Sequence, residues 1–286
     1  MGWKVLGAVQ LSGIEGKAED FKKYRDTIRP LFEKKRPSQP GDWLSQHQET
    51  GQTLEQYIAS QPTRATKNRK TIIIQTIGTF PALQQKSLSI LCEYMALLYN
   101  LSIRMEQPLP LSLIPPEATR EIPSLGVKQL LTSHILHQVL KPRLPADAVA
   151  MLALTSTDLW PGDGWNFVFG QASLRDRVGV WSTARFGDPE KEAQTFLRRV
   201  LHVATHETGH IFGIKHCTAY ECCMNGANHQ IEGDRSPLAF CCECDAKLAW
   251  AANANTKDRA KKLADFMEKI QFPQESEHWK KLATLL

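Results

Sequence analysis

The stretch from His206 to Cys217 constrains this chain most, because it places three histidines, a glutamate and a glycine at fixed spacings. Residues four apart on a helix are turned by only roughly 40° and lie one turn above each other. His206 and His210 can therefore hold one metal ion from the same helix face. Gly213 can end that helix in a left-handed conformation, so that the chain turns and brings His216 back to the ion.

This arrangement favours hydrolysis over a structural metal. Three neutral imidazoles leave the fourth position of a zinc ion for water, whose pKa the ion lowers to about 7. Glu207 points to the same cleft and can reach that zinc-activated water as general base, then carry the proton to the leaving amine. The residues alone predict a metallopeptidase whose catalytic residue is Glu207. Its predicted ligands are His206, His210 and His216.

The extended pattern His-Glu-x-x-His-x-x-Gly-x-x-His resembles the metzincin signature, in which a methionine turn follows downstream. Met224 is the matching methionine and would form an apolar floor beneath the metal. Cys217 directly follows the third histidine, and the chain then reads Cys-x4-Cys-x-Met and later Cys-x2-Cys. This combination is similar to archaemetzincins, a resemblance that runs over roughly residues 71–248.

The archaemetzincin resemblance implies a second, structural zinc, so that the expected cofactors are two Zn²⁺ ions. The matching thiolate positions are Cys217, Cys222, Cys241 and Cys244. A closed shell of four thiolates supplies folding free energy rather than chemistry. The family's register leaves out the neighbouring Cys223 and Cys242. From the residues alone these two could be substitute ligands or a redox pair.

The order of hydrophobic patterns predicts an α/β (α+β) fold. With the resemblance, this implies a metzincin-like (zincin) domain with a mixed twisted sheet, a central active-site helix and a helical C-terminal part. Expected strands are 71–77, 101–111, 148–155, 167–174 and 179–186, and expected helices are 83–98, 127–140, 191–212, 258–270 and 277–285. By the same resemblance, an edge strand just before the active helix would bind peptide by strand addition.

The chain divides into two parts by composition. Residues 1–69 are polar and predict a partly helical N-terminal extension. Residues 70–286 are the predicted catalytic domain, with the sheet and active-site helix in 70–212 and a C-terminal subdomain carrying the structural zinc in 213–286.

The cysteines and the first residues of the chain indicate where in the cell the protein is expected to be. Six of the seven cysteines cluster near the third histidine, which fits a metal site in a reducing compartment. Residues 1–6 lack the features of a signal peptide, and no apolar run reaches membrane length. We expect an intracellular protein, cytoplasmic or also nuclear, that is a monomer with no membrane partner.

Nucleic acid is not an expected partner. The net charge of +5 is modest, and its basic residues lack interleaved aromatics. A zinc ribbon that binds nucleic acid is disfavoured because the cysteines are surrounded by acidic residues that would repel phosphate. These are Glu221, Glu232, Asp234, Glu243 and Asp245.

The predicted function is a zinc-dependent metallopeptidase that hydrolyses a peptide or protein substrate, with Glu207 as general base. Trimming of peptides from the amino terminus, as in an aminopeptidase, and internal cleavage are both compatible with the motif. The alternative is a non-catalytic peptide-binding protein that keeps its zincs for stability. The glutamate argues against it, because a binding protein has no use for a proton shuttle.

Other histidines and the remaining cysteine are not assigned to the site. His202 continues the histidine stripe one turn earlier and is expected to support the ligands or to be exposed. His134 and His137 are expected to be core or solvated residues. Cys92 lies in an apolar helical pattern, where a buried inert thiol is the usual interpretation.

Overall fold

The computed structural model describes residues 17–122, 126–252 and 254–286, and residues 1–6, used above for the expected location, lie outside them. A central sheet has the strand order β2-β1-β5-β8-β7. Its strands are β1 (Thr71–Ile77), β2 (Ser102–Met105), β5 (Ala148–Thr155), β7 (Gly170–Ala172) and β8 (Val178–Ser182). Strands β2, β1, β5 and β8 are parallel, and β7 is antiparallel to β8. The sheet is therefore mixed, as predicted, and β7 forms one edge.

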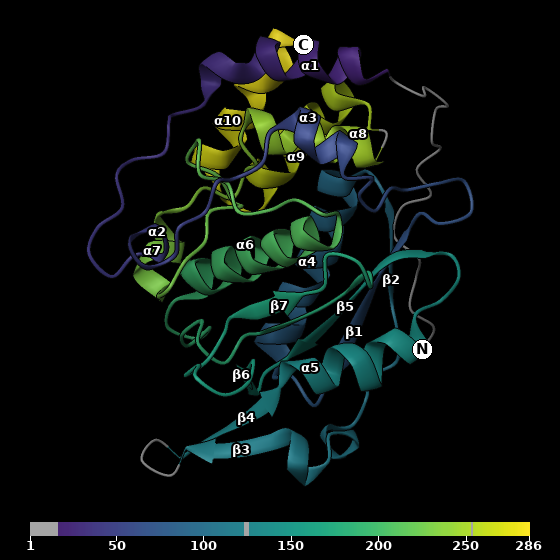
Figure 1. Ribbon diagram of the computed structural model, residues 1–286, viewed down its shortest axis with the longest axis vertical. Coiled ribbons are helices and arrows are strands. Elements are labelled where there is room, and N and C mark those ends of the chain that lie inside the picture. The colour runs from purple at the N-terminus through teal and green to yellow at the C-terminus, as the bar shows by residue number, and fades with distance from the viewer. Residues whose placement is uncertain (1–16, 123–125, 253) are drawn as a thin grey trace.

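Helices cover both faces of this sheet (Figure 1). Side chains alternate along a strand, so neighbouring residues of β1 face opposite sides. Ile72 belongs to the hydrophobic cluster that contains α4 (Ala82–Tyr99) and α6 (Ala193–Ile211). Ile73 belongs to a second cluster with the helical stretch 132–143 on the other face. The sheet is thus the middle of three layers, and α6 lies across it.

Helix α6 is central because it is apolar on more than one face. Phe196, Val200, Leu201 and Ala204 are all buried in the larger cluster. The helix packs against β7, β8 and α4. The sequence predicted a helix over 191–212, and its observed span is two residues shorter at the start and one at the end. Burial on several sides holds its histidine-bearing end in place.

The predicted helix over 127–140 is wrong in its first part. Val127–Leu131 is strand β4, which pairs with β3 (Thr119–Ile122) and β6 (Asp158–Trp160) in a second, three-stranded sheet. Helical structure begins with α5 (Thr132–His134). Leu130 and Leu131 follow Val127 at the three- and four-residue spacing of a helix face, but pairing with two other strands decides the conformation.

The predicted strand over 101–111 is too long, since β2 ends at Met105. Two prolines follow, at 108 and 110. Proline has no backbone N–H to donate to a strand ladder, which explains the early end.

Further helices gather at the end of the molecule that carries the C-terminus (Figure 1). These are α1 (Ala18–Ile28), α3 (Leu54–Ala59), α8 (Cys242–Ala252), α9 (Thr256–Lys269) and α10 (Pro273–Leu285), while α2 (Trp43–Gln46) and α7 (Gln230–Arg235) lie beside each other near one end of α6. The extension shares the larger hydrophobic cluster, because Phe21, Tyr24 and Tyr57 are buried in it. The boundary at residues 69 and 70 stays a prediction.

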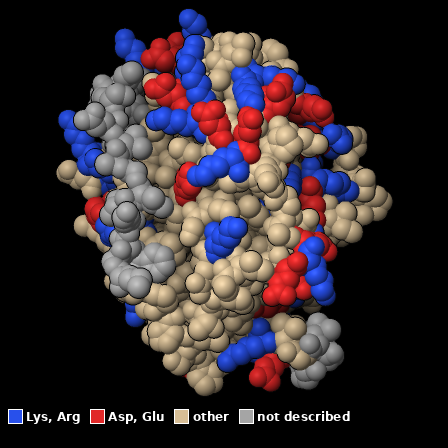
Figure 2. Space-filling view, turned by 180° about the vertical axis from the view of Figure 1, so that it is seen from behind, with Lys and Arg blue, Asp and Glu red and all other residues tan. Residues whose placement is uncertain are grey.

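Surface charges are mixed. On the face drawn in Figure 2, Lys and Arg lie beside Asp and Glu, chiefly toward the helical end. Exposed pairs such as Lys269 with Glu93 and Lys280 with Glu268 have N–O distances of 3.0 and 2.6 Å. Pairs of this kind contribute little to stability because water screens them. Among the described residues, no helix is both long and apolar enough to span a membrane.

Within the described part of the chain, the ion pair between Arg259 and Asp245 is buried on both sides, and it lies where the extension meets the C-terminal helices. Arg259 of α9 lies 2.5 Å from Asp245 of α8, and the two side chains are 0% and 1% exposed. The hydroxyl of Tyr24, in α1, donates to the same carboxylate. Burial, together with the Asp245 charge, raises the pKa of Tyr24 well above its usual value, so the hydroxyl stays protonated. Three helices therefore meet at one carboxylate.

We expect Arg259→Met to destabilise the fold by about 3–5 kcal/mol, because it leaves the Asp245 carboxylate buried without a counter-ion. Thermal unfolding followed by circular dichroism measures the effect as a lower Tm. Lys280→Met is the matched control, since it removes the cation of an exposed pair on α10 and should leave the Tm near that of the parent chain. Equal shifts in the two variants would contradict the importance of the buried pair.

Candidate active site

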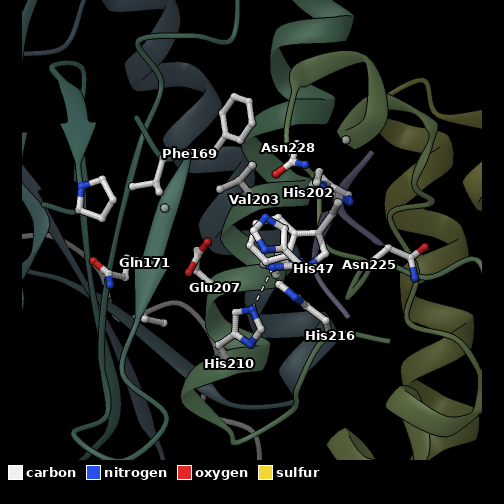
Figure 3. A pocket seen from close by; sticks show the side chains of 18 of the residues that line it. His47, Phe169, Gln171, His202, Val203, Glu207, His210, His216, Asn225 and Asn228 are labelled. Atoms are coloured by element: carbon white, nitrogen blue, oxygen red, sulfur yellow. Dashed lines mark hydrogen bonds between the residues drawn. The ribbon is translucent and has the colours of Figure 1, made fainter. Parts of the chain in front are cut away.

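A cleft of about 1160 Å³ runs beside α6 and contains the residues of the histidine motif. Its lining comes from five parts of the chain: the stretch 161–174 that includes β7, helix α6, residues 215 and 216, the stretch 225–234, and residues 43–51 of the extension. In Figure 3, Glu207 lies between Gln171 of β7 on one side and His216 on the other.

The three imidazoles of the motif converge in this cleft. The Nε2 atoms of His206 and His210 are 3.0 Å apart, and one nitrogen from each of these rings and from His216 lies within 4.8 Å of the others. The Nδ1 atoms of His206 and His210 lie 2.9 and 2.8 Å from the backbone carbonyls of Cys223 and Ile214. A carbonyl only accepts, so each Nδ1 carries the proton and each Nε2 presents a lone pair. This donor set fits a zinc ion.

Burial also keeps the rings of His206 and His210 neutral. It lowers the pKa of His210 to about 3, and the neighbouring His216 adds to the effect. Burial, followed by the charges of His210 and His216, holds the pKa of His206 well below its usual value. Neutral imidazole is the form that binds a metal, so neither ring has to lose a proton first at neutral pH.

Gly213 turns the chain toward His216, as the sequence predicted. Its N–H donates to the His210 carbonyl at 2.8 Å, and the N–H of Ile214 donates to the Gly209 carbonyl at 3.0 Å. This pair of bonds is the Schellman motif that ends many helices. The φ of Gly213 is +81°, a conformation that glycine adopts without strain. The third imidazole thus reaches the other two directly after the helix ends.

Met224 packs against the backbone of α6 between the two helical histidines. A Cβ added at Gly209 would lie only 2.5 Å from the Met224 Sδ, so the thioether sits where a side chain would otherwise be. Met224 is fully buried, and its carbonyl accepts from the Cys217 N–H at 2.8 Å. The methionine therefore lies against the helix that carries His206 and His210, in the position expected of an apolar floor.

Glu207 faces the cleft as a buried carboxylate. It is 5% exposed, and its Oε2 has no hydrogen-bond partner among the described residues. Burial raises the pKa of Glu207 to about 8. A carboxylate in this environment can take up and release a proton near neutral pH, as a general base must.

Strand β7 approaches Glu207 closely. A Cβ added at Gly170 would lie 2.6–2.7 Å from the Cγ, Cδ and Oε1 atoms of Glu207. Only a glycine therefore leaves the carboxylate in its place. β7 pairs with β8 on one side, and its residues line the cleft. The structure thus identifies β7 as the edge strand that precedes the active helix.

Four thiols form a second cluster next to the imidazoles. The sulfur atoms of Cys217, Cys222, Cys241 and Cys244 lie within 4.8 Å of one another, and all four residues are buried. The N–H groups of Cys241 and Met224 point to the Cys222 sulfur at 3.1 and 3.4 Å. Such donors stabilise a thiolate, the form that binds zinc.

Cys223 and Cys242 lie outside this group of four. The Cys223 thiol donates instead to the His202 carbonyl at 3.6 Å. Burial raises the pKa of Cys223 well above its usual value, so it stays a neutral thiol. This arrangement supports the ligand set that the family register implies.

A third group of possible metal ligands is already paired with other groups of the protein. Asp42, His229 and Glu232 lie within 4.8 Å of one another. The Arg235 guanidinium lies 2.5 Å from the Asp42 carboxylate, and Glu232 accepts from the N–H groups of Trp43 and Asn228. An adjacent guanidinium repels a metal cation. We therefore interpret this group as an anchor for the extension rather than as a metal site.

Comparison with known proteins identifies the family. The model of peptidase family M54 matches residues 134–250. Archaemetzincin-2 of Homo sapiens is 34% identical over 265 residues, which cover 80% of this chain and 72% of that protein. Archaemetzincin of Methanopyrus kandleri is 45% identical over 98 residues, which cover 34% of this chain and 54% of that protein. The chain belongs to the archaemetzincin family. It is therefore a zinc metallopeptidase, which confirms the predicted class of enzyme.

The fold agrees with this assignment. The crystal structure of the Methanopyrus kandleri archaemetzincin superposes with a TM-score of 0.54 at 27% identity, covering 66% of this chain and 98% of that one. The predicted mixed α/β architecture is thus confirmed. The roles of individual residues stay predictions, which the geometry above supports.

His202, which was expected from the sequence to support the ligands or to be exposed, is buried and stacks on His206 with ring centroids 6.4 Å apart. Two other residues at the site were not singled out by the sequence. Glu49 contacts His216, a residue 167 positions away, so no local pattern signals it. Gly170 could have been found, because a glycine inside a strand often marks a close approach of another group.

We expect Gly170→Ala to lower the kcat/KM of peptide cleavage by about 100-fold, because a displacement of the catalytic carboxylate by about 1 Å can cost that much. The measurement is turnover of a cleaved peptide, together with the Tm. Gly233→Ala is the control, since its added methyl group meets its nearest neighbour at an ordinary 3.8 Å. Full activity of the Gly170 variant would show that Glu207 does not depend on this contact.

Proposed function

We propose that the chain hydrolyses peptide bonds in this cleft with Glu207 as general base. His206, His210 and His216 hold one zinc ion. The observation that carries the proposal is the position of Glu207. Its buried carboxylate, whose Oε2 has no partner among the described residues, faces the same cleft as the three imidazoles and β7. A purely structural metal site needs no such group, and a buried carboxylate without a partner costs stability.

When bound, zinc makes water a strong nucleophile near neutral pH and polarises the carbonyl of the scissile bond. Glu207 accepts the proton of that water as the oxygen attacks the carbonyl carbon. It then donates the same proton to the nitrogen of the leaving amine. Burial alone raises the pKa of Glu207 to about 8, which favours its protonated form at neutral pH. The positive charge of a bound zinc ion would favour the carboxylate that accepts the proton of water.

Strand β7 is the proposed docking site for the substrate backbone. It pairs on one side with β8, and its residues line the cleft next to Glu207. An extended peptide can add to such an edge through backbone hydrogen bonds. This would place a peptide bond beside the imidazoles, as hydrolysis requires.

The cysteine cluster is the proposed structural zinc site. Its four buried thiols form a closed donor set with no position left for substrate. Cys217 follows His216 directly, so the two sites share one short piece of backbone. Zinc at the thiols thereby restrains the arm of residues 213–218, which carries the third imidazole, His216.

We expect Glu207→Gln to keep the fold and its zinc content but to lower peptide turnover by at least about 100-fold, the contribution of a general base. A peptide-library digest read by mass spectrometry, run with the parent chain and the variant, measures this. The new termini also distinguish amino-terminal trimming from internal cleavage. Turnover by the variant at the parent rate would show that another group is the base, and a parent chain that cleaves nothing would favour a binding protein.

We expect Cys241→Ser to reduce zinc from two ions to one per chain and to lower peptide turnover, because the arm that carries His216 loses its support. Elemental analysis gives the zinc content. Cys92→Ser is the control, since Cys92 is a buried thiol of α4 outside the cluster and its pKa is raised to about 12 by burial. Full zinc content and full activity in Cys241→Ser would refute the structural site.

A further inference from the structure

The arm that carries the third imidazole, residues 213–218, is held by the N-terminal extension. The Tyr57 hydroxyl donates to the Phe212 carbonyl at 2.7 Å, just before this arm. The Gln52 side-chain amide donates to the Gly213 carbonyl at 3.4 Å and accepts from the Lys215 N–H at 3.3 Å. These contacts come from residues more than 150 positions earlier in the chain.

The same part of the extension continues along the backbone of the arm to Thr218. A Cβ added at Gly51 would lie 2.5 Å from the Thr218 Oγ1, so the two segments are in direct contact. The arm is therefore lined on one side by residues 51–57 of the extension.

Glu49 contacts the third imidazole itself. Both of its carboxylate oxygens lie 3.0 Å from the Nδ1 of His216. A carboxylate ion only accepts, so this Nδ1 carries the proton and the Nε2 is left with a lone pair. His206 and His210 donate to neutral backbone carbonyls instead. His216 is thus the one ligand of the three with a charged acceptor, which makes its Nε2 a stronger donor to a metal.

Trp43 restricts the same ring from a second direction. Its indole lies edge-on to the His216 ring, with centroids 5.1 Å apart and an interplanar angle of 81°. Trp43 is fixed in turn, because its backbone N–H donates to Glu232 at 2.9 Å and its ring occupies the space that a Cβ at Gly226 would need. The ring of His216 is therefore oriented by a carboxylate and by an aromatic edge, both from the extension.

We propose that Glu49 is a positioning residue for His216, which makes the N-terminal extension a working part of the metal site. The inference rests on the proposed role of His216 as a zinc ligand. Glu49 lies outside residues 134–250, which the family model matches, so the family assignment does not supply this role. By orienting the ring and fixing its tautomer, Glu49 raises the affinity of the three-histidine site for zinc.

The test measures the transfer of zinc from the zinc-loaded chain to a coloured chelator, and it compares the parent chain with variants at Glu49. We expect Glu49→Ala to weaken zinc binding at the histidine site by about 10- to 100-fold, the usual effect of removing such a partner. Glu49→Gln should weaken it less, because its amide oxygen still accepts the Nδ1–H but carries no charge. The zinc at the cysteines and the Tm should change little in both variants.

Glu55→Gln is the matched control. Glu55 belongs to the same extension, but its carboxylate pairs with Arg25 at 2.9 Å and not with a residue of the cleft. It should release zinc at the parent rate. Parent-like release from Glu49→Ala overturns the inference, and so does a loss of both zinc ions with a large fall in Tm, which indicates a merely structural role. His206→Ala tests the proposed function separately, because an unchanged zinc content in that variant means that the histidines bind none.

Discussion

The reversal of the chain at Gly213 is the constraint on which the site depends. Two histidines four residues apart need only the helix that carries them, whereas the third must return from beyond its end. The φ of +81° requires a glycine at the turn, and so does packing, because a Cβ there would lie 2.8 Å from the Pro62 side chain. The turn that completes the ligand set therefore lies in close contact with the N-terminal extension.

Different parts of the chain restrain each functional group from separate directions. Burial of α6 between sheet and helices fixes His206 and His210, and their Nδ1 atoms are held by backbone carbonyls. Glu207 is confined by the bare backbone of Gly170 in β7. A site assembled in this way needs little rearrangement when a substrate binds, which is how an enzyme stabilises a transition state without reorganising at that moment.

What the sequence could predict was local. Strands β1 and β5 match their predicted ranges, because each is a buried apolar run with clear ends. The histidine set was predicted from its spacing and the cysteine set from the family resemblance. The structure brings the members of each set together, and their role as zinc ligands stays a prediction. Strand β4 was mistaken for a helix because its partners β3 and β6, not its own periodicity, decide its conformation. Glu49 and Trp43 were missed for the same reason, as their contacts with His216 span more than 160 residues.

The two supports of the third imidazole act on different degrees of freedom. The cysteine cluster and the bond from the Cys217 N–H to the Met224 carbonyl fix the backbone next to His216. A fixed backbone still leaves the ring free to rotate about its side-chain torsions. Glu49 and Trp43 restrain that rotation, and they lie outside the part of the chain that holds the ligands. Proteins that share the seven proposed ligands can therefore differ in zinc affinity through segments that the ligand motif does not include.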